Sequence, residues 1–470
     1  MVFSSTVFIF CFLPLVLLVS FALSRKAQNI WLLIASLLFY AWGGVSYSVI
    51  LIGSLVINYV FGLLIDKFPN NQKRVLGIGV GLNLAILAVF KYADFFIENI
   101  NQVIGAEFPL PNIKLPIGIS FFTFQAISYL VDVYRKETKV QKSIVDLSLY
   151  ISLFPQLIAG PIVRYHDIAL QLKNRVRNLE KFVSGAERFI IGLSKKVLLA
   201  NTFALVADDV FAGSDASVTA TMALVGALAY SLQIYFDFAG YSDMAIGLGR
   251  MFGFEFKENF NFPYLAKSIQ EFWRRWHISL STWFRDYLYI PLGGNRANKR
   301  RVYINLFIVF LCTGFWHGAS WNFIIWGLFH GLFLVIERVG FKNILAKLPA
   351  AVSRIYTLII VVLGWIFFRA ENLHNALEMT SKFFSAFNEF NIAEAASLMT
   401  KDVIIASVFA LFAFVGSTEK IYQKLEDGKW GLFQSSLFTS AKYATLILAL
   451  LICMAFLSAD TYNPFIYFRF

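Results

Sequence analysis

The stretch Thr313–Gly331, TGFWHGASWNFIIWGLFHG, decides the fold of its region. It lies in a segment, 302–336, that contains no Asp, Glu, Lys or Arg. One membrane crossing needs ~20 predominantly apolar residues, and the Gly-Ala-Ser sequence at 318–320 offers a break near the middle. We therefore predict a helical hairpin with spans at 302–317 and 320–337.

Two histidines lie inside this hairpin. Counted from the start of the first span, His317 is ~22 Å along the helix at 1.5 Å per residue, so it should sit near the hairpin tip and well inside the protein. An ionisable side chain at such a depth is by default a functional hypothesis. The alternative is a structural imidazole bonded to a neighbouring helix. For His330, in the middle of the second span, we expect a helix–helix hydrogen bond.

The composition of the whole chain points the same way. Of its 470 residues, 58% are hydrophobic and only 15% are charged, whereas soluble domains have about 25% charged residues. Long apolar runs recur from end to end without the alternation of a β-barrel strand, and backbone groups in lipid must be satisfied within the segment. We predict an all-α, polytopic membrane protein that forms a single membrane-embedded domain over 1–470.

The apolar runs predict about eleven or twelve transmembrane helices, with 29–41 short for a full crossing. The segment 146–161 contains two prolines between basic loops, so we expect a re-entrant or interfacial segment buried in protein. The first run should be a retained span with its N-terminus outside. The candidate spans are 7–23, 29–41, 45–65, 75–91, 115–133, 189–211, 218–237, 302–317, 320–337, 353–369, 402–418 and 441–459.

The formal net charge of +12 comes from loops between the apolar runs. Loop Lys and Arg face the cytoplasm, which places 162–188 and 254–301 inside, while the acidic 371–401 is expected outside. We therefore expect membrane lipids, and no nucleic acid, as partners of the basic loops. The three cysteines are scattered in apolar runs and indicate neither a disulfide framework nor a metal site.

A second candidate site is the segment 271–289, which we predict to be one amphipathic helix lying at the membrane interface. Its apolar face would carry Trp273 and His277. The cations Arg274, Arg275 and Arg285 fall on the rest of its surface. The simpler role of this segment is to anchor the protein at the membrane interface. The functional hypothesis is that it forms a basic, aromatic wall beside an entrance to the site from the cytoplasm.

Two carboxylates, Asp237 and Asp243, interrupt the apolar stretch YFDFAGYSDMAIGLGRMFG. Unpaired carboxylates there would be costly, so we expect partners, plausibly nearby arginines, and a structural role more than a catalytic one. The chain has no Gly-x-Ser-x-Gly, no His-Glu-x-x-His and no phosphate-binding glycine loop. These absences argue against serine hydrolases, zinc proteases and ATP-driven pumps.

Two long motifs resemble a known family. FDFAGYSDMAIGLGRMFGFEFKENFNFPYLAKSIQEFWRRWHISLSTWFRDYLYIPLGGNR and the later FWHGASWNFIIWG are similar to the membrane-bound O-acyltransferase (MBOAT) family, and most of all to its bacterial alginate O-acetyltransferase branch. LPIGISFFTFQAISYLVDVYR and LFPQLIAGPIVRY also resemble that branch. The resemblance covers nearly the whole chain and is weakest over 371–440.

This resemblance implies a passage between the two membrane faces, an acyl donor on the cytoplasmic side and a hydroxyl acceptor outside. His317 matches the family's signature histidine and would be the general base, and His277 matches its second histidine and would donate a hydrogen bond to the donor carbonyl. Trp316 and Trp321 would wall a dry pocket. Contacts to substrate are also expected from Trp273, Arg274, Arg275, Arg285 and Asp237.

The donor would be acetyl-coenzyme A or another acyl thioester used as substrate, with no resident cofactor. The acceptor would be alginate, another exopolysaccharide, cellulose or peptidoglycan, and periplasmic proteins of an acetylation complex are expected partners. The location implied is the bacterial cytoplasmic (inner) membrane. Two alternatives stay open. One is a transporter or flippase of a lipid-linked sugar, with His317, Asp237 and Asp243 as a proton relay. The other is an acyl conduit that feeds a periplasmic acetyltransferase.

Overall fold

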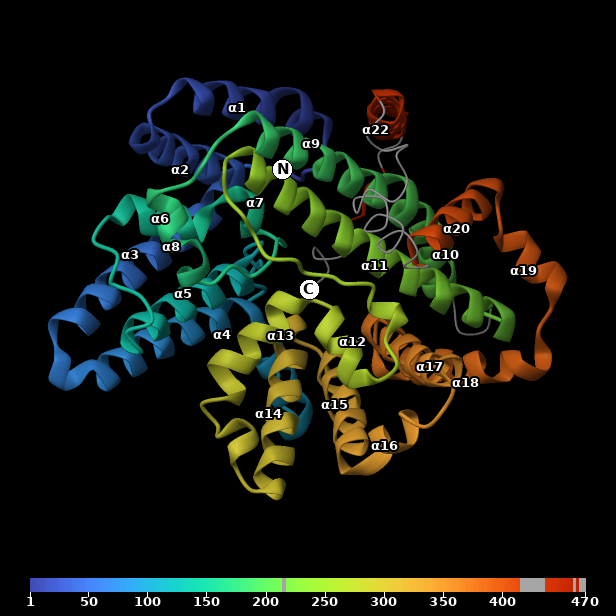
Figure 1. Ribbon diagram of the computed structural model, residues 1–470. Coiled ribbons are helices and arrows are strands. Elements are labelled where there is room, and N and C mark those ends of the chain that lie inside the picture. Colours follow the sequence, from blue (N-terminus) through green and yellow to red (C-terminus); the bar gives the residue numbers. More distant parts are fainter. Residues whose placement is uncertain (214–216, 415–435, 460–461, 465–470) are drawn as a thin grey trace. The chain divides into compact units, whose positions relative to one another are not determined.

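The structure is a computed structural model, and it describes residues 1–213, 217–414, 436–459 and 462–464. Within these ranges every regular element is a helix, which confirms the predicted all-α fold (Figure 1). The helices form two compact units. Unit 1 comprises Met1–Phe189, Met244–Glu258 and Thr282–Pro291, and unit 2 comprises Ile190–Asp243, Asn259–Ser281 and Leu292–Phe470.

Seven helices in the described ranges are long and apolar enough to cross a membrane, and a bent pair, Ile392–Leu398 with Lys401–Phe412, would make an eighth. The chain is therefore a multi-pass membrane protein. The seven are Val45–Lys67, Pro69–Ile104, Leu179–Ala212, Ala220–Met251, Trp321–Leu345, Ala350–Arg369 and Thr439–Ala459.

Seven is a minimum beside the predicted eleven or twelve, since it counts only long and strongly apolar helices among the described residues. Several predicted spans form helices that are short or that begin with cations, such as α2 (Arg25–Ala41) and α14 (Lys299–His317). Phe8–Ala22 and Ile119–Tyr134 are apolar but shorter than a full crossing. The end of the predicted span 402–418 lies outside the described residues.

Unit 1 is built around a buried helix, α5, which packs against α3 and α4. The segment predicted to be re-entrant forms two short helices, α6 and α7, which break at Leu153 just before Pro155. Both are buried, as expected of irregular backbone at membrane depth. The helices of this unit are α1 (Leu13–Ala22), α2, α3 (Val45–Lys67), α4 (Gln72–Ile104), α5 (Ile119–Tyr134), α6 (Ile144–Ser152), α7 (Phe154–Leu157) and α8 (Tyr165–Lys173).

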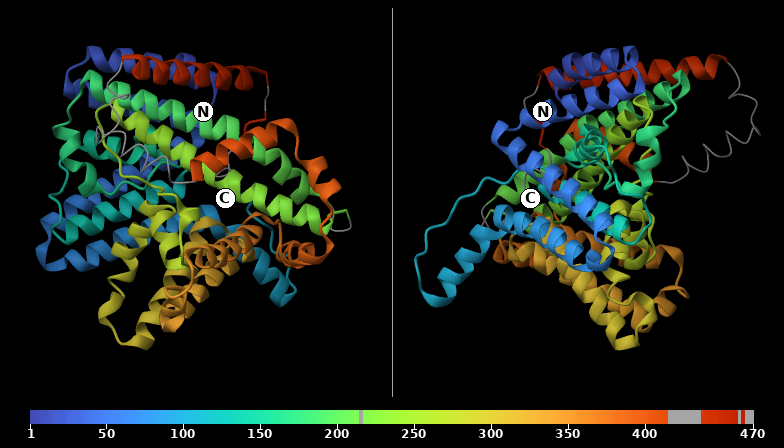
Figure 2. Two further views of the ribbon diagram at one scale, coloured as in Figure 1. Left: turned by 45° about the vertical axis from the view of Figure 1, so that its right-hand side comes forward. Right: turned by 90° about the vertical axis from the view of Figure 1, so that its left-hand side faces the viewer.

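The predicted hairpin of unit 2 is present as α14 and α15 (Trp321–Ile336), which pack along their length; Figure 2 shows it from two further sides. Glycines permit this close approach. A Cβ atom on Gly314 would lie 2.4 Å from the backbone oxygen of Phe323, and one on Gly327 would lie 2.3 Å from that of Phe310. Any larger residue at either position would push the two helices apart.

The other helices of unit 2 supply the walls of the candidate site and the outer surface. The longest, α11 (Ala220–Met251), contributes its last residues to unit 1, as α9 (Leu179–Ser194) contributes its first. The helix α13 (Ile278–Phe284) is divided between the units after Ser281. The remaining helices are α10 (Asn201–Ala212), α12 (Ile269–Arg275), α16 (Lys342–Leu345), α17 (Ala350–Arg369), α18 (Leu373–Glu389), α19 (Ile392–Leu398), α20 (Lys401–Phe414) and α22 (Ser436–Ala459).

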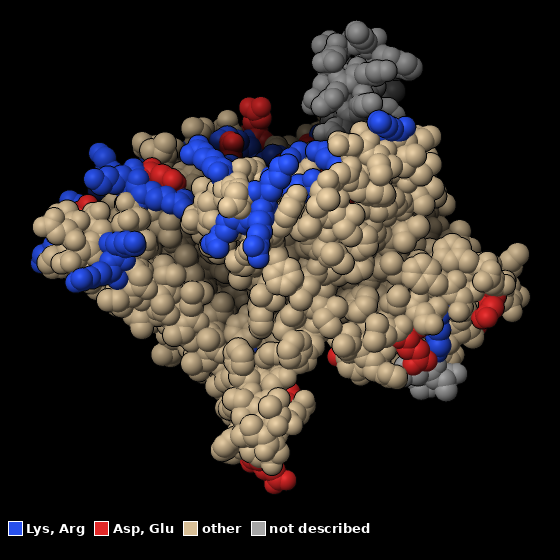
Figure 3. All heavy atoms as spheres, turned by 90° about the horizontal axis from the view of Figure 1, so that it is seen from below, with Lys and Arg blue, Asp and Glu red and all other residues tan. Residues whose placement is uncertain are grey.

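Large apolar side chains are exposed on many helices, including Leu18, Val103, Phe409 and Leu451. Much of the surface in Figure 3 carries no charged group. In water such extended apolar surface would cause association. On a multi-pass protein it is the surface that faces lipid.

Candidate active site

His317 is the last residue of α14, at the tip of the hairpin, and only 6% of its surface is exposed. Three aromatic rings contact its imidazole edge to face: those of Trp316 at 4.8 Å, Trp326 at 4.9 Å and Phe368 at 5.1 Å between centroids. This arrangement confirms the predicted hairpin and the prediction that His317 lies well inside the protein. It surrounds an ionisable group with apolar rings, which disfavours a charge on it.

The turn after His317 depends on Gly318. The backbone becomes extended there, and a Cβ atom would lie 2.2 Å from the ring of Phe323. The aromatic wall differs from the expected one, because Trp321 begins α15 and is 54% exposed. Its expected place beside the imidazole is taken by Trp326, which is 1% exposed.

The second histidine of the hairpin, His330, is fully buried. Its ring packs against Trp273 and Trp326, each at 5.2 Å. Among the described residues neither of its nitrogens has a hydrogen-bond partner, so the predicted helix–helix hydrogen bond is wrong. The cause is the neighbouring α17, where Gly364 brings only backbone against the ring: a Cβ atom there would lie 2.6 Å from His330 Nε2.

The same aromatic cluster contains two buried indole N–H groups, on Trp273 and Trp326. Within the described ranges neither indole nitrogen meets an acceptor. Buried polar groups in proteins are nearly always hydrogen-bonded, and a catalytic role is one of the reasons for an exception. The cluster therefore holds donors suited to a polar group brought by a substrate.

The predicted single helix at 271–289 is broken at His277. α12 ends at Arg275, and His277 adopts a left-handed backbone conformation with φ 44° before α13 begins. Asn259 stabilises the break, because its backbone oxygen accepts the N–H of Ile278 at 2.9 Å. The prediction that this segment is one helix is therefore wrong, and His277 is 0% exposed inside unit 2.

The side chain of Asn259 also fixes the tautomer of His277. Its Oδ1 accepts the backbone N–H of Ser279 at 3.2 Å and the hydroxyl of the same residue at 2.8 Å. A backbone N–H can only donate, so the atom facing His277 Nδ1 at 3.1 Å is an oxygen, and Nδ1 must carry the proton.

Burial lowers the pKa of His277 to about 3, so the ring is neutral near pH 7. With Nδ1 protonated, Nε2 holds a lone pair, and among the described residues it has no partner. The expected donation from His277 to an acyl carbonyl does not fit this tautomer. His277 is instead an acceptor, directed by Asn259 and packed on Phe238 at 4.6 Å.

The three predicted arginines have different surroundings and are divided between the two units. Arg274 is exposed on α12, whereas Arg275 pairs with Glu271 at 2.8 Å. Arg285 belongs to unit 1 and pairs with Asp286 at 2.7 Å. In unit 2, Arg274 is thus the best placed of them to meet an anionic ligand.

The two buried carboxylates have lysine partners, where we expected arginines. Asp237 Oδ1 lies 2.8 Å from Lys196 Nζ, with both side chains at most 3% exposed, and Asp243 lies 2.7 Å from Lys195. These lysines occupy a π-helical turn, 195–200, which follows α9. These ion pairs give both carboxylates a structural role in the packing of helices.

Unit 1 contains a separate polar cluster around His166. Its Nδ1 lies 2.9 Å from Asp132 Oδ2, and Tyr287 donates to Asp132 Oδ1 at 2.7 Å. Asp132, Glu137 and His166 are the only described residues grouped as metal ligands would be. Their hydrogen bonds already satisfy Asp132, so we assign no metal ion to this cluster.

With this geometry in hand, comparison with known proteins gives the class. The profile of the membrane-bound O-acyltransferase family, MBOAT, matches residues 117–372, a range that includes both hairpin histidines and His277. The chain belongs to the MBOAT family. It is an O-acyltransferase of the membrane.

Individual relatives add detail. A probable alginate O-acetylase of Pseudomonas putida is 44% identical over the full length of both chains. A peptidoglycan O-acetyltransferase of Helicobacter pylori is 37% identical over 100% of this chain and 98% of its own. A teichoic acid D-alanyltransferase of Bacillus subtilis is 30% identical over 48% of this chain and 60% of its own.

Sequence reasoning missed two residues of the site. Trp326 lies four residues before His330 on α15, so helical spacing alone places both on one face and would have found it. Asn259 carries no such signal: it lies 18 positions before His277 in an irregular segment, and only the folded chain brings them together.

Proposed function

We propose that the protein transfers an acetyl group from a cytoplasmic thioester, acetyl-coenzyme A or a similar donor, to hydroxyl groups of an extracytoplasmic polysaccharide. The membrane would be the bacterial inner membrane. Support comes from the full-length relatives, which are named for acetylation of alginate and of peptidoglycan. The observation that carries the proposal is the buried His317 among aromatic rings at the tip of a hairpin.

His317 would act as the general base. A sugar hydroxyl is a weak nucleophile near pH 7, and a neutral imidazole can take its proton as the oxygen attacks the thioester carbonyl. The new C–O bond forms, the C–S bond breaks, and the proton held on the imidazole passes to the leaving thiolate. The aromatic wall of Trp316, Trp326 and Phe368 would exclude water, which competes with the hydroxyl for the acyl group.

The developing negative charge on the carbonyl oxygen needs donors. The indole N–H groups of Trp273 and Trp326 are the buried donors of the cluster, and we assign this role to them in place of His277. His277 Nε2, as an acceptor, would hold an O–H or N–H group of a substrate. The two histidines would thus have different tasks, set by their surroundings.

The donor is proposed to approach from the side where basic loops gather, which is the cytoplasmic side by the positive-inside rule. Arg274 is exposed on α12, the helix that carries Trp273 into the cluster. A coenzyme A thioester is polyanionic, and an arginine at such an entrance forms charge-assisted hydrogen bonds to phosphate.

The test uses purified protein in liposomes with acetyl-coenzyme A labelled on its acetyl group. Alginate oligosaccharides, peptidoglycan fragments or no acceptor would be enclosed on the opposite side. We expect labelled, esterified acetyl on one glycan. Release of the thiol without formation of a glycan ester would favour a conduit to a partner transferase. Label that reaches the acceptor side only as free acetate would contradict the proposal.

A further inference from the structure

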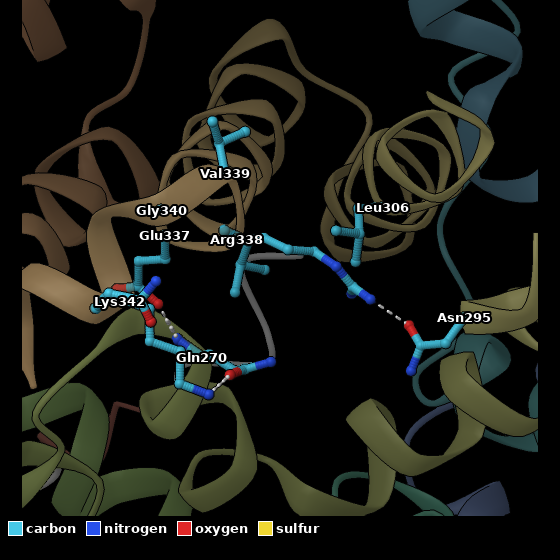
Figure 4. A pocket seen from close by; sticks show the side chains of 10 residues that line it. Gln270, Asn295, Leu306, Glu337, Arg338, Val339, Gly340 and Lys342 are labelled. Atoms are coloured by element: carbon cyan, nitrogen blue, oxygen red, sulfur yellow. Dashed lines mark hydrogen bonds between the residues drawn. The ribbon is translucent and has the colours of Figure 1, made fainter. Parts of the chain in front are cut away.

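A pocket with no assigned role lies at the end of the α14–α15 hairpin opposite to His317. Its volume is about 350 Å³, within the range of ~300–1,000 Å³ that is usual for small-molecule sites. Figure 4 shows that the side chain of Arg338 extends across it toward Asn295 from the π-helical segment Glu337–Phe341, which follows α15. Its lining residues are Gln270, Asn295, Leu306, Leu334, Glu337, Arg338, Val339, Gly340, Lys342 and Asn343.

Two cations of the pocket are held by amide oxygens. Arg338 Nη2 donates to Asn295 Oδ1 at 2.6 Å, and Lys342 Nζ donates to Gln270 Oε1 at 2.9 Å (Figure 4). Both cations are exposed at the pocket mouth. Charge-assisted bonds to a phosphate are stronger than bonds to a neutral amide, so an anionic ligand could replace these contacts.

The single carboxylate of the pocket, Glu337, is 2% exposed and already hydrogen-bonded. It accepts the backbone N–H groups of Ile269 at 2.6 Å and Gln270 at 3.0 Å. With two cations against one carboxylate, the lining carries one net positive charge. The exposed part of the pocket presents the cations, because the carboxylate is turned inward.

An apolar flank is formed by exposed side chains of the helical segments that build the pocket, and one of them, Val339, is itself part of the lining. Leu332 is 56% exposed, Val339 67% and Ile344 53%. Three consecutive cations, Lys299, Arg300 and Arg301, begin α14 at this end of the hairpin. By the positive-inside rule they mark the level of the cytoplasmic headgroups.

We propose that this pocket binds the phosphate headgroup of an anionic phospholipid from the cytoplasmic leaflet. Arg338 and Lys342 bind the phosphate, the amides of Asn295 and Asn343 face the headgroup hydroxyls, and the acyl chains lie on the exposed apolar surface. Basic pockets between helices at this level are suited to such headgroups. The apolar flank favours a lipid over a soluble phosphate, which would leave that surface unused.

The test compares lipid binding by native mass spectrometry and by thermal stabilisation of purified, delipidated protein. The probes are phosphatidylglycerol, phosphatidylcholine and inorganic phosphate. We expect saturable stabilisation by phosphatidylglycerol, with affinity reduced at least about tenfold in R338A/K342A. The matched control K347A/R354A removes two exposed cations of unit 2 outside the pocket and should bind as the wild type does.

A charge-preserving variant, R338K/K342R, separates loss of charge from loss of fold, and we expect it to retain most of the binding. Equal phosphatidylglycerol binding by R338A/K342A and the wild type would overturn the proposal. So would equal stabilisation by phosphatidylcholine, or full competition by inorganic phosphate at similar concentration. Lipid binding of this kind does not depend on acyl transfer, so each proposal can fail alone.

Discussion

His277 Nδ1 lies 3.1 Å from Asn259 Oδ1, and the same oxygen accepts two hydrogen bonds from Ser279. The amide therefore fixes both the direction of the imidazole and the nitrogen that carries its proton. The backbone of His277, at φ 44°, is held in an uncommon conformation by the same residue. Asn259 is thus a positioning residue for a buried histidine of the site.

Substitution Asn259→Leu, of similar size, should lower acetyl transfer by at least about tenfold, or about 1.4 kcal/mol in the barrier. It removes the acceptor that holds Nδ1–H, so Nε2 loses its fixed lone pair. Steady-state transfer rates of the purified variant measure this. Ser242→Ala removes only the partner of Asn259 Nδ2, at 3.1 Å, and should lose less than about threefold. If Asn259→Leu transferred acetyl at the wild-type rate, the fixed tautomer of His277 would have no part in the reaction.

Trp326→Phe should reduce transfer by about tenfold or more, because it deletes a buried indole N–H and part of the wall beside His317. Trp321→Phe, in the same helix, should change the rate by less than about threefold, since that side chain is half exposed. The two variants measured in parallel form a matched pair. A larger effect at Trp321 would contradict the assigned wall.

Asp237→Asn should destabilise the protein by about 3–5 kcal/mol, because it leaves the Lys196 ammonium buried without its counter-charge. The double variant Lys196→Met with Asp237→Leu should recover much of that loss. Thermal unfolding in detergent, followed by tryptophan fluorescence, compares the three proteins. A folded Asp237→Asn with normal stability and a raised KM would instead indicate the substrate contact expected from sequence.

The pKa of His166 is raised, above all by its hydrogen bond to Asp132. A raised folded-state pKa adds stability that is fully present below the unfolded value of about 6.5 and is lost as pH rises through the folded value. The gap in unfolding temperature between the wild type and His166→Gln should therefore be larger at pH 5.5 than at pH 9. His374→Gln, at an exposed histidine, is the control. A gap that grows toward high pH would contradict this sign.

Much of the fold could be predicted because the local composition of a segment indicates whether it forms a membrane helix. The charge-free segment and its Gly-Ala-Ser break sufficed to place His317 at a hairpin tip, and the prolines near 155 indicated the broken, buried segment. Both follow from rules that act within a few turns of helix. The number of spans is less directly readable from composition, because helices such as α14 begin with cations.

The site itself depends on contacts far apart in sequence. Periodicity treated 271–289 as one helix, since nothing local shows that Asn259 captures the backbone at Ile278 and breaks it. Charge proximity suggested arginine partners for Asp237, whereas packing of the π-helical turn brings a lysine. Amide-directed tautomers and cross-helix ion pairs are tertiary features, and a pattern of residue types does not specify them.

The most direct test of the account is the rate of acetyl transfer from acetyl-coenzyme A by purified wild-type protein and by His317→Ala. Both must elute as the same monodisperse species and unfold at similar temperatures. The account predicts turnover in the wild type and a loss of at least about a thousandfold in the variant, since the buried base is gone. Equal rates in the two proteins would contradict the central role of His317.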